Sequence, residues 1–278
     1  MADAAETEAS FRDAVREQTR LIDVTLIAAI PIVMLGVFAL PRATKMEFVL
    51  YYTRPTILTA YTSHFVHLGV EHLLVNLLFY VLLVPVTYLS WTLAGRRKTF
   101  LVIAVVVILT YPFLLSWVNL SLVRNRFGFG FSGMNAALLG SLPLALVEYL
   151  RVRFGLNIDL SYSPLYFFVG AAIIATISVP PSYLSVFAGL MAVFGALTYA
   201  AWTFRSIESR TALRGVLRSP GFGELAIGGH VLFLLFPFVA FPMAPEGGVS
   251  LANYFIHLLG FAMGFIAPFV TLNLVDIH

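Results

Sequence analysis

Eight long apolar runs constrain the fold of this chain of 278 residues more than any other feature. Each run is close to the roughly 20 residues that a helix needs to cross the hydrocarbon core of a bilayer. Because a backbone in lipid must satisfy its own hydrogen bonds, runs of this kind form helices. We expect spans at about 21–40, 71–93, 99–119, 132–150, 164–180, 183–204, 225–243 and 250–275. The sequence therefore predicts an all-α, polytopic transmembrane helical bundle.

The composition excludes a water-soluble globule. Charged residues make up 11% of the chain, whereas a soluble domain carries about 25%. Cysteine is absent, so the chain has neither disulfides nor a thiolate nucleophile nor a cysteine metal site. No basic patch is interleaved with aromatic side chains, and we expect no nucleic-acid partner and no cofactor. The expected surroundings are the lipid bilayer, with the chain as a multi-pass integral membrane protein.

Composition also divides the chain. Residues 1–20 mix acidic and basic side chains and are predicted as a short polar cytoplasmic segment, followed by a membrane domain over 21–278. The segment 41–70 is half apolar and rich in aromatic side chains, which is typical of sequence lying in the membrane interface. Pro180 and Pro181 split a run that is too long for one crossing, because proline breaks a helix.

The positive charges indicate an orientation. With eight spans and the N-terminus in the cytoplasm, both termini are cytoplasmic, and the cell membrane is the expected location. Twelve Arg and Lys residues then lie inside and five outside, which is a clear positive-inside bias. The inside set is Arg12, Arg16, Arg20, Arg96, Arg97, Lys98, Arg151, Arg153, Arg205, Arg210, Arg214 and Arg218; the outside set is Arg42, Lys45, Arg54, Arg124 and Arg126.

Three of the spans that run from outside to inside begin with polar motifs. Ser132 opens span 132–150, framed by Gly130 and Gly133, and glycines let the backbone turn sharply and approach a substrate closely. A serine at a helix start is often only an N-cap. It becomes an activated nucleophile when a base lies within hydrogen-bond reach. His257, at the start of the last span, is the candidate base.

Small residues offer a way to bring these two groups together. Gly260 and Gly264 form a stripe on the last span that permits close helix packing, and Gly133 begins a matching surface on span 132–150. No carboxylate is placed to complete a triad, so the predicted catalytic unit is a Ser–His dyad of Ser132 and His257.

Two further polar residues share one face of span 71–93. His72 and Asn76 are four residues apart, and both side chains can donate hydrogen bonds to a developing oxyanion. Polar groups at membrane depth are costly and point to function, although helix–helix hydrogen bonding is the alternative. His67 is interpreted as a buried histidine that braces the interfacial segment. A metal site from His64, His67 and His72 is disfavoured, because no second cluster completes four ligands.

Together these motifs resemble those of the rhomboid intramembrane serine proteases. The family pattern H-x4-H-x3-N is matched by His67, His72 and Asn76, G-x-S-G is matched around Ser132, and H-x2-G-x3-G is matched by His257, Gly260 and Gly264. The resemblance covers residues 63 to 264. It implies that Ser132 attacks, that His257 takes its proton, and that His72, Asn76 and the Ser132 amide hold the oxyanion.

The chain departs from the family pattern in three places. Leu58 and Thr59 stand where a Trp-Arg pair is common, and Ala136 stands where an aromatic residue often packs on the histidine. Three spans rather than one separate the serine and histidine helices. A six-helix rhomboid-like core with about two additional helices at 164–204 would preserve the topology, with 225–243 as the helix beside the active site.

The resemblance implies an intramembrane serine endopeptidase that acts on transmembrane protein substrates. The alternative is a catalytically inactive rhomboid-like protein that binds or escorts membrane helices. A small-solute transporter is a third class, but its site would need polar residues near the bilayer centre, whereas those in this chain gather at one end of the helices. No feature of the sequence indicates an oligomeric state.

Overall fold

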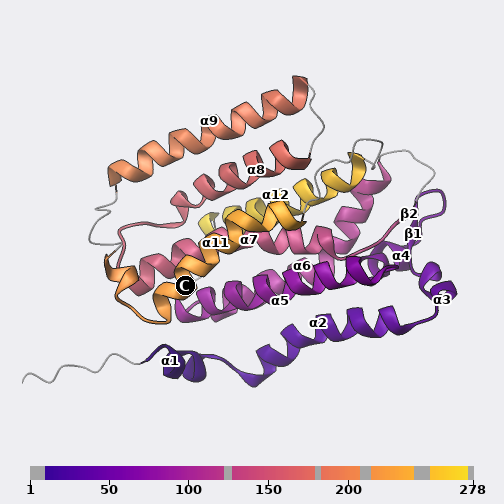
Figure 1. Cartoon of the computed structure of the whole chain (residues 1–278), viewed down its shortest axis with the longest axis horizontal. Coiled ribbons are helices and arrows are strands. Elements are labelled where there is room, and N and C mark those ends of the chain that lie inside the picture. Colours follow the sequence, from indigo (N-terminus) through magenta and orange to yellow (C-terminus); the bar gives the residue numbers. More distant parts are fainter. Residues whose placement is uncertain (1–9, 122–126, 179–182, 207–213, 241–250, 275–278) are drawn as a thin grey trace, which may run out of the picture.

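The computed structural model describes residues 10–121, 127–178, 183–206, 214–240 and 251–274. In these ranges the chain forms a helical bundle with one short strand pair (Figure 1). The elements are α1 (Phe11–Gln18), α2 (Leu21–Ala39), α3 (Arg42–Glu47), β1 (Leu50–Tyr51), α4 (Ile57–Thr62), the 3-10 turn η1 (Ser63–Phe65), α5 (Val70–Leu93), α6 (Arg97–Leu120), β2 (Phe127–Gly128), α7 (Ser132–Phe154), the 3-10 turn η2 (Leu160–Tyr162), α8 (Pro164–Ser178), α9 (Tyr183–Ser206), α11 (Phe222–Ala240) and α12 (Leu251–Leu274).

Each predicted span is a helix whose ends lie close to the predicted ones. Of the helices that the structure describes, six are long and apolar enough to cross a membrane: α2, α5, α6, α7, α11 and α12. The predicted all-α polytopic bundle is therefore confirmed. Helix α8 has 15 residues, fewer than the roughly 20 that a perpendicular crossing needs. It pairs with α9 at one side of the bundle (Figure 1); the predicted turn at Pro180-Pro181 lies outside the described residues.

Helix α7 is the centre of the bundle, and α5, α6, α11 and α12 pack around it. Over its apolar stretch, 94% of the residues are buried within the protein. Its contact with α12 is made backbone to backbone. A Cβ added to Gly264 would lie 2.6 Å from the Cα of Ala137, and one added to Gly140 would lie 2.8 Å from the amide nitrogen of Phe265. The small-residue stripes expected from the sequence thus face each other.

The segment 41–70 crosses one end of the bundle as α3, β1, α4 and η1 (Figure 1). Strand β1 pairs antiparallel with β2, which precedes α7, so that Leu50 lies opposite Gly128. The side chain of Lys45 donates to the main-chain carbonyl of Phe38 at the end of α2 (3.1 Å). The segment therefore links the chain before α7 to the end of α2, and its helix α4 packs against α6.

Two buried carboxylates lie at the opposite end of the bundle. Asp23 on α2 is paired with Arg97 at the start of α6. Glu148 on α7 is paired with Arg96 at 2.7 Å and with Arg151 at 2.6 Å. A buried charge that loses its partner destabilises a fold strongly. These pairs therefore fix α2 and α7 to the turn between α5 and α6.

The polar N-terminal segment contributes α1, and residues 1–9 lie outside the described part. The hydroxyl of Ser10 caps α1 by accepting from the amide of Asp13 (3.3 Å). The ring of Phe11 packs edge-on against Phe222 at the start of α11, with 5.1 Å between ring centroids. Helix α1 is thus docked onto the end of the bundle that carries the buried carboxylates.

Candidate active site

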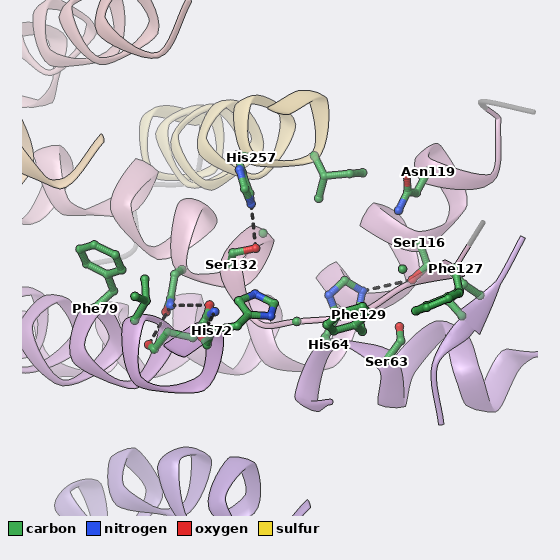
Figure 2. Close-up of a pocket in the computed structure, with 18 of the residues that line it drawn as sticks. Ser63, His64, His72, Phe79, Ser116, Asn119, Phe127, Phe129, Ser132 and His257 are labelled. Carbon is green, nitrogen blue, oxygen red and sulfur yellow. Dashed lines mark hydrogen bonds between the residues drawn. The ribbon is translucent and has the colours of Figure 1, made fainter. Parts of the chain in front are cut away.

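The N-terminal ends of α5, α7 and α12 meet at a cavity of about 470 Å³. His72 reaches it from α5, Ser132 from α7 and His257 from α12 (Figure 2). Asn76 on α5 also lines the cavity. Three motifs that are far apart in the sequence therefore line one space. The three helices begin at the same end of the bundle, as the sequence predicted. The strand pair β1–β2 contributes to the cavity wall.

Ser132 is the first residue of α7, and the loop before it is tightly built. Gly130 has φ of +107°, a conformation that residues with a Cβ rarely adopt. A Cβ at this position would also lie 2.6 Å from Cε1 of His72. The amide of Gly130 donates to the carbonyl of Ser63 (2.9 Å). Gly130 is thus required both for the turn into α7 and for the approach of His72.

His257 and Ser132 form a hydrogen bond. The Nε2 atom of His257 lies 2.7 Å from Oγ of Ser132 (Figure 2), and His257 is 8% exposed. A neutral imidazole protonated on Nδ1 accepts the serine proton at Nε2. This is the geometry that a general base needs in order to activate a serine.

In the rhomboid pattern an aromatic residue often packs on the histidine, but this chain has Ala136 at that position. Helices α7 and α12 pack closely there instead. A Cβ on Gly260 would lie 3.3 Å from the Cβ of Ala136, and one on Gly133 would lie 2.9 Å from Cγ2 of Ile256. A larger side chain at position 136 would meet the backbone of α12. The small residue and the close contact therefore belong together, and the helix itself holds His257 in position.

The expected oxyanion donors lie around the same cavity. Asn76 is buried, and its Nδ2 donates to the carbonyl of His72 (2.8 Å), which leaves one of its two amide hydrogens for a ligand. The amide of Ser132 is in the first turn of α7, where helix amides have no acceptor within the helix. The His72 ring packs against the rings of His67 and Phe129, at 5.0 Å and 5.6 Å between centroids. The positive end of the α7 dipole adds to the attraction for an anion.

His67 is fully buried and supports the loop before Ser132. Its Nδ1 donates to the carbonyl of Phe65 (3.3 Å), and its Nε2 accepts from the amide of Phe131 (3.5 Å). The acceptor role of Nε2 requires the neutral ring protonated on Nδ1, and burial lowers the pKa of His67 to about 3. His67 therefore connects the segment 41–70 to the residue before Ser132.

His64 lines the same cavity but bonds to groups of α6. Its Nε2 lies 3.0 Å from the carbonyl of Pro112 and 3.1 Å from Oγ of Ser116 (Figure 2). Burial lowers the pKa of His64 to about 4. His64 and His67 are thus each engaged with protein groups. In the ranges that the structure describes, no group of three His, Cys, Asp or Glu side chains could hold a metal ion.

The motifs did not indicate two features that the structure shows. Asn135, one turn after Ser132, is buried against Asn76 and lines the cavity. Its signal was a polar residue at helical spacing from the serine within an apolar span. At the position of the absent Trp-Arg pair, Thr59 forms a reciprocal capping box with Thr56, and Leu58 is 61% exposed. These residues begin a helix, α4, rather than reaching into the site.

Comparisons of this chain with protein-family models, with curated proteins and with solved structures gave no match. The site itself consists of a serine hydrogen-bonded to a histidine, in a cavity lined by hydrogen-bond donors, at one end of a bundle whose helices are long enough to cross a membrane.

Proposed function

We propose that this protein is an intramembrane serine endopeptidase of the rhomboid type, which cleaves transmembrane segments of membrane proteins through a Ser–His dyad. The observation that carries the proposal is the 2.7 Å contact between Oγ of Ser132 and Nε2 of His257, which joins the two helices α7 and α12. These two helices are among six described helices that are long and apolar enough to cross a membrane. A substrate that reaches it from the bilayer is itself membrane-embedded.

The reaction follows from the placement of the groups. Oγ of Ser132 attacks the scissile carbonyl carbon while its proton passes to Nε2 of His257. The carbonyl oxygen becomes an oxyanion, which the Ser132 amide, His72 and Asn76 stabilise. His257 then gives its proton to the leaving amine, and the C–N bond breaks to leave an ester on Ser132. Water, activated by the same histidine, hydrolyses the ester.

The charge asymmetry supports an orientation for this chemistry. With both termini in the cytoplasm, the Ser132 end of the bundle opens toward the outer face of the cell membrane. A silent escort of membrane helices is the competing function. The preserved Ser132–His257 geometry favours catalysis, because such an escort has no need of a serine hydrogen-bonded to a histidine.

A serine-directed probe tests the proposal most directly. The detergent-purified protein is incubated with a fluorophosphonate, and cleavage of a model transmembrane substrate is measured in proteoliposomes. Ser132→Ala should lose both labelling and cleavage while keeping the wild-type thermal stability. The matched control is Ser141→Ala, since Ser141 is a buried serine on the same helix whose hydroxyl donates to the Leu138 carbonyl. Cleavage by Ser132→Ala at the wild-type rate would refute the mechanism; a wild-type protein that binds substrate helices without labelling or cleavage would be the silent escort.

A further inference from the structure

Asn135 connects the nucleophile helix to one of the expected oxyanion donors. It lies on α7, one turn after Ser132, and is 2% exposed. Its Nδ2 donates to the main-chain carbonyl of Asn76 (3.0 Å) and to Oδ1 of the same residue (3.3 Å). Oδ1 of Asn135 has no hydrogen-bond partner among the described residues, and Asn135 lines the cavity.

Main-chain carbonyls fix the orientation of both side-chain amides. A carbonyl oxygen only accepts, so the carbonyl of Asn76 must face the NH₂ group of Asn135. In the same way, the carbonyl of His72 must face the NH₂ group of Asn76. The Oδ1 atom of Asn76 then points to Asn135, which is where the 3.3 Å contact between the two side chains lies. Both orientations agree, so the network holds the Asn76 amide in one state.

The two anchors of Asn76 differ in kind. The His72 carbonyl belongs to α5, the helix of Asn76 itself, and moves with it. Asn135 belongs to α7, the helix that begins at Ser132. Its bonds therefore set the position of the Asn76 amide relative to the serine. Misplacing a catalytic group by about 1 Å can lower a rate about 100-fold, so this coupling matters for turnover.

We propose that Asn135 is a positioning residue: it holds the free N–H of Asn76 toward the oxyanion that forms on the substrate of Ser132. The inference rests on the proposed function and adds to it a residue that neither the motifs nor the resemblance contain. Asn135 acts through Asn76, and the charge it helps to stabilise exists only in the transition state. Its loss should therefore lower kcat and leave KM nearly unchanged.

Asn135→Leu is the first variant, because leucine is similar in size and cannot donate. We expect kcat to fall about 10- to 100-fold and KM to stay within about twofold. Asn135→Asp is the second, because it keeps the shape but places an acceptor opposite the two oxygens of Asn76. It should be at least as impaired, and it provides the same measurements if Asn135→Leu yields too little folded protein.

A double-mutant cycle separates positioning from a merely structural role. Asn76→Ala removes the donor, so in that background Asn135→Leu should cause no further loss of kcat beyond about twofold. A loss that multiplies with that of Asn76→Ala, or a single variant with wild-type kcat, would overturn the inference while leaving the peptidase standing. If wild-type protein shows no Ser132-dependent cleavage, the proposed function itself fails, and the role of Asn135 with it.

Discussion

The packing of α12 against α7 makes Gly264 a sensitive point of the molecule. We expect Gly264→Ala to damage both cleavage and stability, although the change adds a single methyl group. The added Cβ would lie 2.6 Å from the Cα of Ala137, whereas two carbon atoms in contact need about 3.5–4.0 Å. Because the neighbour is backbone, no side-chain rotation relieves the clash.

The geometry sets the size of the effect. Helix α12 must retreat by about 1 Å to accommodate the methyl group, and overpacking of this kind typically costs about 1–3 kcal/mol in stability. His257 lies two turns earlier on the same helix face, so the retreat stretches its 2.7 Å contact with Ser132. A displacement of about 1 Å at a reacting group lowers the rate about 100-fold. Cleavage should therefore fall more than stability alone would explain.

The assay is cleavage of the model transmembrane substrate, with thermal unfolding measured on the same preparation. Gly228→Ala is the matched control, because Gly228 lies within α11 and a Cβ there would meet nothing within 4 Å. Alanine is also the better helix former by about 1 kcal/mol, so the control should be neutral or slightly stabilised. Wild-type cleavage and wild-type stability in Gly264→Ala would show that the α7–α12 contact does not position His257.

Three further outcomes are expected. Asn76→Ala should lower kcat about 100- to 1,000-fold, as for a lost oxyanion donor, yet still be labelled slowly at Ser132; wild-type turnover would move the oxyanion to other groups. The pKa of His67 is lowered from 6.5 to about 3. The stability that the neutral ring contributes is therefore complete above pH 6.5 and is lost as the pH falls toward 3, by about 2 kcal/mol at pH 5. Thermal unfolding of His67→Gln should depend less on pH in this range than that of the wild type, and an equal dependence would contradict the assignment. A cysteine at exposed Arg54 should react with an impermeant reagent from outside the cell, whereas one at exposed Asn157 should not; the reverse pattern would invert the topology.

The spans could be predicted from sequence because lipid imposes a simple length rule. A helix must cross about 30 Å of hydrocarbon, so the boundaries of α5 and α7 follow from where apolar runs begin and end. The stripe of Gly260 and Gly264 was readable for a similar reason, since only small residues let two backbones touch in a membrane. These features depend on local sequence, and the structure has them where they were expected.

Other features depend on which side chains meet, and periodicity does not encode that. Asn135 is one polar residue in an apolar span until α5 places Asn76 beside it. Ala136 looked like a missing contact, whereas the structure shows it as the residue that admits α12. The role of Thr59 as a capping residue of α4 likewise depends on the hydroxyl of Thr56 beside it.

The candidate site meets an energetic requirement that polar groups in water meet more easily. An unpaired polar group in an apolar interior costs several kcal/mol, so polar side chains buried in a membrane protein need partners before any ligand arrives. Ser132 is hydrogen-bonded to His257, and Asn76 is hydrogen-bonded to the His72 carbonyl and to Asn135. Each partner also fixes the direction in which the group points. The same hydrogen bonds therefore offset the cost of burying these groups and hold them in defined orientations. This is why a substitution such as Asn135→Leu should act on turnover even though it touches no reacting atom.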